Sequence, residues 1–272
     1  TYAFPKLGRL QVAKIQTADV VACLTPIWSE KPETANRVRQ RIEAVIDYAS
    51  ALGIREGDNP ARWRGHLDNL LPKPTKVKAV KHHPALPHAE IAGFMADLSN
   101  RSGVAVRALD FTVLTAARSG ETRGMMWAEV DLENGVWTIP AERMKAGKEH
   151  RVPLTPQAIA CLGSRGGYAS LVFESETKPG RPISDMSMTA VLRRMERNGI
   201  TVHGFRSTFR DWAGETTRFP REVIEAALAH GIKDKAEAAY ARSDLFDKRR
   251  KLMEAWANAA KAIDFGSNLV AI

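Results

Sequence analysis

Apolar residues recur at helical spacing in the first quarter of the chain. Between residues 38 and 52 they follow the i, i+4, i+7, i+8 pattern of one buried helix face, formed by Val38, Ile42, Val45, Ile46, Ala49 and Leu52. Gly53 follows and suits a helix C-terminus. A shorter helix is predicted after residues 17–19, with Val20, Val21 and Leu24 facing inward. No segment here alternates as a strand does, so residues 1–80 are predicted to form a small helical domain.

Prolines and lysines alternate after this helical region. The prolines are Pro72, Pro74, Pro84 and Pro87, and the lysines between them are Lys73, Lys76, Lys78 and Lys81. A continuous helix is excluded because each proline lacks a backbone N–H and fixes φ. We interpret residues 81–87 as a linker to a second domain, residues 88–272. The lysines are either solvated or bound to phosphate, and the adjacent His82 and His83 are interpreted as solvated linker residues.

The pattern after the linker is mixed. Residues 88–101 and 103–117 are predicted to form two helices separated by Gly103, the second apolar enough to be a core helix. Residues 136–139 follow a Glu-Asn-Gly turn and indicate a strand, and residues 151–154 indicate a second one, with a polar loop between them. A long helix is predicted over about 245–262. The fold class is therefore mainly α with a small antiparallel β-sheet (α+β).

Composition places the chain among ordinary globular proteins. It has 272 residues, of which 44% are hydrophobic and 26% charged. Only two cysteines occur, so neither a disulfide framework nor a zinc site is expected. No apolar run approaches the roughly 20 residues that span a bilayer. These features predict a cytoplasmic protein without a membrane-spanning segment. The chain begins at Thr1 without a signal peptide or initiator Met, so we expect it to be a fragment.

Net charge points to a polyanionic partner. The formal charge is +9 and the pI about 9.7. Residues 1–83 carry 14 Lys and Arg against 8 Asp and Glu, a net of +6, so the other 189 residues hold only +3. DNA, RNA and an anionic membrane are all compatible with this charge, and so is a basic protein with solvated helix faces. The more basic helical domain would suit contact with DNA phosphates.

Most catalytic templates are absent from the sequence. There is no Walker loop, because residues 164–167 (Ser-Arg-Gly-Gly) lack the Gly-Lys-Ser/Thr ending. No Gly-x-Ser-x-Gly elbow occurs, and the acidic residues do not form the cluster expected of a two-metal nuclease. The sequence therefore predicts neither a metal site nor a cofactor.

Cationic and polar residues instead follow one another in an ordered series. These residues are Arg118, Lys145, His203, Arg206, His230 and Tyr240. Their order and flanking sequences resemble the catalytic domain of tyrosine recombinases of the phage-integrase kind. Residues 137–145 and 244–250 resemble most closely the integrases of satellite phages and genomic islands. The resemblance extends over the whole chain, with residues 1 to about 83 similar to the helical core-binding domain. Nothing in the chain resembles the N-terminal arm-binding domain that such integrases often carry.

The resemblance implies a role for each residue. Tyr240 would be the nucleophile that forms a 3′-phosphotyrosyl link, and Arg118 and Arg206 would hold the non-bridging phosphate oxygens. Lys145 would protonate the leaving 5′ oxygen, and His203 and His230 would contact the phosphate and manage the proton of the nucleophile. The implied function is site-specific recombination during integration or excision of a mobile element. Metal and ATP are not required, because charged side chains neutralise the phosphate and the link conserves bond energy.

The resemblance also implies partners. These are double-stranded DNA, further copies of the chain in a homotetramer on two DNA sites, and an excisionase or a host DNA-bending protein as accessory factors. Lys73, Lys76, Lys78 and Lys81 are candidate DNA-binding residues. Whether the Tyr240 helix packs in cis is left open.

Other interpretations stay open from the sequence alone. Arg118 could be a cation at a helix end, Arg206 a partner of Asp211 or Glu215, and Lys148 a rival of Lys145. His203 could be a buried histidine, His230 a helix cap and Tyr240 a packing residue. At the level of function, the alternatives are a type IB topoisomerase, a DNA-binding regulator without catalysis and an RNA-binding protein.

Overall fold

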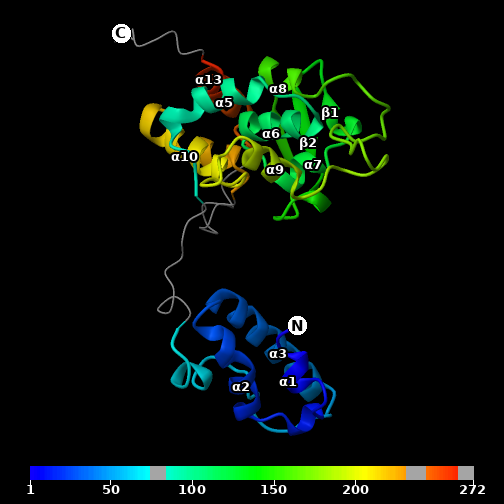
Figure 1. The fold of residues 1–272 in the computed structure, drawn as a ribbon, viewed down its shortest axis with the longest axis vertical. Coiled ribbons are helices and arrows are strands. Elements are labelled where there is room, and N and C mark those ends of the chain that lie inside the picture. Colours follow the sequence, from blue (N-terminus) through cyan, green and yellow to red (C-terminus); the bar gives the residue numbers. More distant parts are fainter. Residues whose placement is uncertain (74–83, 231–242, 263–272) are drawn as a thin grey trace. The chain divides into compact units, whose positions relative to one another are not determined.

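The computed structural model of the chain describes residues 1–73, 84–230 and 243–262 (Figure 1). Two compact units are present, Thr1–His82 and His83–Ile272, and each has a hydrophobic core of its own. Within these described ranges most regular structure is helical, and one small sheet lies in the second unit. The predicted α+β class is therefore confirmed. The assignment of residues 1–80 as DNA-binding and of residues 81–87 as a linker stays a prediction.

All regular structure among the described residues of the first unit is helical. Its elements are α1 (Phe4–Leu7), η1 (Val12–Lys14), α2 (Thr17–Trp28), α3 (Pro32–Ala51) and η2 (Leu67–Asn69). Helices α2 and α3 pack against each other around Val20, Leu24, Ile42 and Ile46. Helix α3 begins with a proline, which its first turn tolerates, and ends before Gly53, whose φ of +68° favours glycine. Both helices predicted here are confirmed.

The buried face of α3 differs from the predicted one. Val45 and Leu52 are exposed, at 62% and 55% of their surface, whereas Ala35, Ile42 and Ile46 are buried. The prediction of a broad apolar face was wrong at these two residues because the elements that pack against α3, chiefly α2 and η1, cover a narrower stripe. Val45 instead lines an open apolar groove beside α1.

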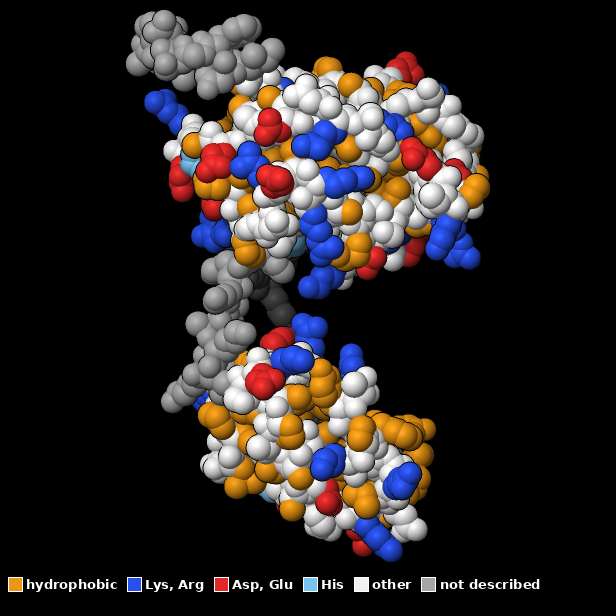
Figure 2. All heavy atoms as spheres, in the orientation of Figure 1, with side chains coloured by type: hydrophobic (Ala, Val, Ile, Leu, Met, Phe, Trp, Pro, Cys, Tyr) orange, Lys and Arg blue, Asp and Glu red, His pale blue; other side chains and the backbone are white. Residues whose placement is uncertain are grey.

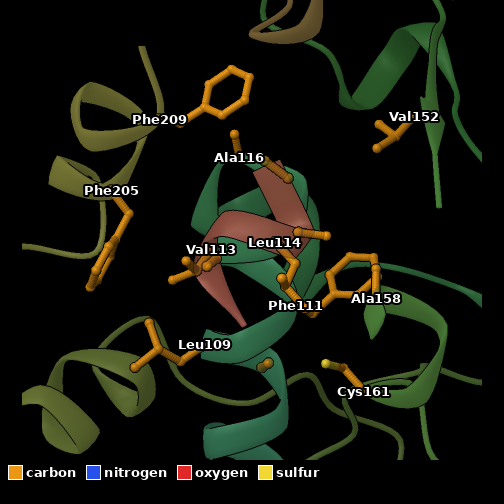
Figure 3. Packing of buried hydrophobic residues seen from close by; sticks show 14 of the residues in the cluster. Leu109, Phe111, Val113, Leu114, Ala116, Val152, Ala158, Cys161, Phe205 and Phe209 are labelled. Carbon is orange, nitrogen blue, oxygen red and sulfur yellow. The ribbon is translucent and has the colours of Figure 1, made fainter. Parts of the chain in front are cut away.

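The second unit is built around α6. Its helical elements are η3 (His88–Glu90), α5 (Ile91–Ser99), α6 (Val104–Thr115), α7 (Ser119–Arg123), η4 (Trp127–Glu129), η5 (Ala141–Arg143), α8 (Pro156–Ala160), α9 (Ser187–Arg194), α10 (Gly204–Thr216), α11 (Arg221–Ala227) and α13 (Phe246–Ala260). Leu109, Phe111, Val113 and Leu114 of α6 contact apolar side chains on several sides, among them Phe205 and Phe209 from α10 and Ala158 from α8 (Figure 3). The predicted core helix is therefore confirmed, and Gly103 precedes it with φ +109°.

The sheet has three antiparallel strands in the order β1-β2-β3. These are β1 (Val130–Asp131), β2 (Val136–Ile139) and β3 (His150–Pro153), with Trp137 paired to both Val130 and Val152. The two predicted strands are confirmed to within one residue. Strand β1 was missed because two residues are too few for alternation to show. Trp137, Ile139 and Val152 are buried, so one face of the sheet packs on the core.

Helix α13 closes the core beside the C-terminal end of α6. The indole Nε1 of Trp256 donates to the carbonyl of Val113 at 2.9 Å, and its ring contacts Phe209 and Trp212 of α10 at centroid distances of 5.5 and 5.0 Å. Residues 84–86 also contact α10, because the hydroxyl of Thr208 donates to the carbonyl of Leu86 at 2.6 Å. The end of α6 and the start of α10 are thus held rigidly, and the predicted site residues Arg118 and Arg206 lie beside them.

Lys and Arg side chains are spread over the visible face of both units, with Asp and Glu between them (Figure 2). No single patch dominates that face. The positive charge on this face is therefore distributed and not gathered at one place.

Candidate active site

Arg118 is positioned by the chain reversal between α6 and α7. Helix α6 stops at Thr115 because Ala116 adopts a left-handed conformation with φ +50°, and Arg118 then caps α7. The carboxylate of Glu121, buried at 7% exposure, accepts from the Arg118 backbone N–H at 2.8 Å and from its Nη1 at 2.6 Å. One acidic residue therefore fixes both ends of Arg118. We did not predict Glu121, although an acid three residues after a helix cap is a signal readable from sequence.

Arg206 is a buried cation held by backbone carbonyls. It lies in the first turn of α10 with 6% exposure. Its Nη1 donates to the carbonyl of Ala116, and its Nη2 donates to that of Leu228 at 2.5 Å. Burial, followed by the nearby charge of Arg118, lowers the pKa of Arg206 to about 10, so the side chain stays charged at neutral pH. Its bonds do not include Asp211 or Glu215, the partners considered from sequence.

His230 joins Arg206 to a second acid, Glu225, which is partly buried. Its Nε2 lies 3.2 Å from Arg206 Nη2, and its Nδ1 lies 2.6 Å from Glu225 Oε2 on α11. Because a guanidinium only donates, we assign Nε2 as the acceptor and Nδ1 as the nitrogen that carries the proton. Burial alone would raise the pKa of Glu225, but the hydrogen bond from His230 and the charge of Arg210 outweigh it and lower that pKa. Glu225 was not predicted from sequence.

Two residues with strained backbone conformations lie beside Arg118 and Arg206. Among the described residues, four that are not glycine have positive φ: Ala116, Glu196, Ala229 and Leu245. Two of them supply carbonyls to the arginines, since Ala116 accepts from Arg206 and Ala229 accepts from Arg118 Nη2 at 3.5 Å. Such conformations persist where surrounding contacts hold them, and they cluster at functional sites. The two guanidiniums are thus held near each other despite their like charge.

Lys145 and Lys148 are both exposed on the loop between β2 and β3. Met144, immediately before Lys145, is buried at 6% exposure, and Gly147 turns the loop with φ +61°. Of Arg118, Arg206 and His230, only His230 can accept a hydrogen bond from a lysine side chain, and the structure gives neither lysine that bond.

Some of the remaining predicted residues are exposed in the structure, and others lie outside the described residues. His203 is exposed at the N-terminus of α10, so the buried alternative does not hold for it. Lys73 is exposed in the first unit. Tyr240, Lys76, Lys78 and Lys81 lie outside the described residues, and so do His82 and His83.

Groups of three or more His, Cys, Asp or Glu suited to a metal ion are absent from the described part of the chain. None of its helices is long and apolar enough to cross a membrane.

His150 is a further residue of this cluster that we did not predict. It opens β3 and is paired in register with Ile139. Burial first, and then the charges of Arg249, Arg118 and Arg206, lower its pKa from 6.5 to about 4, against an opposing effect of Glu121. His150 is therefore a neutral imidazole beside the two arginines at neutral pH.

This lowered pKa predicts a pH dependence of stability. Between pH 6.5 and 4 the unfolded chain binds more protons at this residue than the folded one, so the free energy of unfolding falls as pH falls. The loss from His150 is expected to reach up to about 3 kcal/mol at pH 4. Urea unfolding of the wild type and His150→Gln at pH 7 and 4.5 measures it. The variant should lose less stability on acidification, and equal losses would contradict the prediction.

Two family models match the chain. Residues 1–66 match the phage integrase central domain, and residues 85–245 match the phage integrase family. The second match alone covers more than half of the chain. The chain belongs to the phage integrase family. Its two matched regions fall in the two compact units, and the arginine cluster lies in the region matched by the second model.

Relatives in this family include prophage and phage integrases. The chain is 32% identical over 271 residues to prophage integrase IntA of Escherichia coli K12, and 30% identical over 279 residues to the integrase of enterobacteria phage P4. These alignments cover 97% and 94% of this chain but only 63% and 62% of the relatives. The chain thus spans less than two thirds of the length of these relatives.

Solved integrase structures share the fold. The Tn1549 transposon integrase in complex with circular intermediate DNA aligns with a TM-score of 0.61 at 14% identity, covering 91% of this chain and 88% of that one. A lambda integrase dimer bound to a COC′ core site aligns with a TM-score of 0.60 at 19% identity, covering 88% and 84%. These identities are low, so the likeness concerns the fold and leaves the chemistry to be argued from this chain's own residues.

Proposed function

We propose that this integrase-family chain is a site-specific DNA recombinase that cuts and rejoins strands through a 3′-phosphotyrosyl intermediate. The observation that carries the proposal is the pair of arginines Arg118 and Arg206, fixed by Glu121, strained backbone carbonyls and His230. Two fixed guanidiniums side by side repel each other, and a phosphate between them would relieve that repulsion. Family membership supports recombination as the reaction served.

The cleavage step uses the predicted residues in order. The hydroxyl oxygen of Tyr240 attacks the phosphorus, a bond from phosphorus to tyrosine forms, and the bond from phosphorus to the 5′ oxygen breaks. Arg118 and Arg206 stabilise the negative charge that grows on the non-bridging oxygens. Lys145 gives its proton to the 5′ oxygen, while His203 and His230 contact the phosphate and handle the tyrosine proton. A 5′ hydroxyl from another strand reverses these steps and completes the exchange.

The proposed substrate is double-stranded DNA, bound by a homotetramer that holds two sites. Lambda integrase is known as a dimer on a core site and as a tetramer bound to a Holliday junction, and its fold is shared by this chain. We propose the same assembly here, with Lys73, Lys76, Lys78 and Lys81 on phosphates and with an excisionase or a DNA-bending protein as accessory factors. We also propose that the protein is cytoplasmic.

The proposal is tested with a nicked suicide duplex that carries the end of the host element. The protein is expected to form a covalent adduct, visible on a denaturing gel, whose DNA-linked tryptic peptide contains Tyr240. A type IB topoisomerase would form a similar adduct but reseal the same strand, so exchange between two labelled duplexes separates the two activities. Clear DNA binding without any adduct would instead indicate a non-catalytic regulator and overturn the proposal.

Lys145→Ala is expected to slow cleavage of the ordinary duplex by about 10²- to 10⁴-fold, the range for loss of a general acid. A duplex with sulfur at the bridging 5′ position should restore the rate, because a thiolate leaves without protonation. Adduct formation on both duplexes measures this. Lys148→Ala, on the same loop, is the matched control and should cleave both duplexes normally. Rescue of Lys148→Ala instead would assign the role to that lysine.

A further inference from the structure

Asp244 lies at the centre of an ionic cluster that connects β3 with the start of α13. Arg151 of β3 makes a forked contact, with Nε and Nη2 at 3.0 and 2.8 Å from Oδ2 and Nη2 at 3.0 Å from Oδ1. Arg249 of α13 adds a bond from Nη2 to Oδ2 at 2.9 Å. We call Arg151, Asp244, Phe246 and Arg249 the Asp244 cluster. Forked arginine contacts fix the orientation of a carboxylate as well as its position.

Arg249 is the buried member of the cluster. Its side chain is 1% exposed, yet its bonds are all within the cluster: Nε donates to the carbonyl of Asp244 at 2.7 Å and Nη1 to that of Arg151 at 2.6 Å. The Phe246 ring lies under the guanidiniums of Arg151 and Arg249, at 4.5 and 5.5 Å from its centroid. A buried cation requires its partners, so these contacts are not interchangeable surface pairs.

The backbone at this position is strained. Leu245, directly before α13, has φ +56°, a conformation that a leucine rarely adopts. Its N–H donates to the hydroxyl of Ser243 at 3.1 Å, and the N–H of Phe246 donates to Asp244 Oδ1 at 3.2 Å. Strain of this kind is kept where the surrounding contacts determine the conformation, and it clusters at functional sites. The start of α13 is therefore held in one conformation.

The cluster also lies close to the arginine site. Arg151 follows His150 in β3, and the charges of Arg249, Arg118 and Arg206 all lower the pKa of His150. In the sequence, three residues separate Tyr240 from Asp244. Four extended steps span at most about 14 Å, so a fixed Asp244 limits where Tyr240 can lie.

We propose that the Asp244 cluster holds the start of α13 against strand β3 and thereby positions the nucleophile Tyr240, which lies four residues before Asp244 in the sequence. The inference rests on the proposed function, since it assumes that Tyr240 attacks the phosphate. Its members are positioning residues, because they act through Tyr240 and do not contact the phosphate themselves.

The test compares Asp244→Asn, which removes the charge at constant size, with the wild type on the suicide duplex. At saturating DNA the rate of adduct formation should fall by about 10- to 100-fold, the cost of a misplaced nucleophile, while the DNA concentration for half-saturation stays unchanged. Asp97→Asn is the matched control, because Asp97 is an exposed acid paired with Arg197 at 3.5 Å in the same unit. It should keep the wild-type rate.

A second readout is independent of activity. The chain has four tyrosines, so fluorotyrosine labelling gives four ¹⁹F resonances, and the one absent from Tyr240→Phe is assigned to Tyr240. Asp244→Asn should shift or broaden this resonance alone. If Asp244→Asn does not fold, Arg151→Ala replaces it, since Arg151 is 45% exposed and the buried Arg249 pair remains.

An unchanged adduct rate together with an unchanged Tyr240 resonance would overturn the inference. A loss of rate accompanied by an equal loss of DNA affinity would also overturn it, because the cluster would then bind DNA and not position Tyr240. Absence of an adduct in the wild type, or an adduct that persists in Tyr240→Phe, would refute the proposed function instead, so the two failures are distinguishable.

Discussion

Tyr240→Phe is expected to abolish the covalent adduct on the suicide duplex while DNA binding is retained. The phenol oxygen is the atom that becomes bonded to phosphorus, and phenylalanine removes that atom alone. An unassisted tyrosine has a pKa near 10 and is a weak nucleophile, so no other tyrosine can replace it without the arginine site beside it. Adduct yield on a denaturing gel and binding by mobility shift measure the two effects separately.

Tyr168→Phe provides the matched control, because Tyr168 lies in the same unit, is 75% exposed and makes none of the hydrogen bonds that hold Arg118, Arg206 and His230. This variant should form the adduct at the wild-type rate. Tyr2 and Tyr48 lie in the first unit and should behave likewise. Persistence of the adduct in Tyr240→Phe, with its loss in one of the others, would reassign the nucleophile.

The sequence motifs predicted the residues of the arginine cluster. They did not predict the neighbouring residues that hold the cluster in place. Arg118, Arg206 and His230 were chosen from motifs far apart in sequence, and the fold brings them together. Glu225 was missed because its bonds to His230 and Arg210 depend on how α11 packs against α10. His150 was missed because its neighbours come from α7, α10 and α13, and strand periodicity carries no information about them.

Helix and strand positions followed from periodicity where a segment was long enough. The core helix α6 and the strands β2 and β3 were readable because apolar residues recur along them. The exposure of Val45 and Leu52 was not readable, because periodicity indicates an apolar face but not how many neighbours exist to cover it. The left-handed conformations of Ala116, Ala229 and Leu245 were also hidden, since none of these residues favours positive φ and only tertiary contacts hold them there.

Arg206→Ala is expected to reduce adduct formation by at least about 10²- to 10³-fold, the range for loss of one donor to a developing oxyanion. The charge of Arg206 is buried and aimed at the site by two carbonyls, so no exposed lysine nearby can take its place. DNA affinity should change by only a few-fold, because phosphate contacts elsewhere on the basic surface supply most of the binding. Single-turnover cleavage and mobility shifts measure the two quantities.

Loss of stability must be separated from loss of catalysis in this variant. Removing Arg206 leaves the carbonyls of Ala116 and Leu228 without their donor, which costs about 1–3 kcal/mol in the free energy of unfolding. Arg107→Ala is the matched control, because Arg107 Nη1 also donates to two carbonyls, those of Cys161 and Leu162 at 3.3 and 2.8 Å, away from the site. Arg107→Ala should lose comparable stability yet still cleave DNA. If both variants lost cleavage equally, Arg206 would be a structural residue, and the charge-stabilising role proposed for it would be wrong.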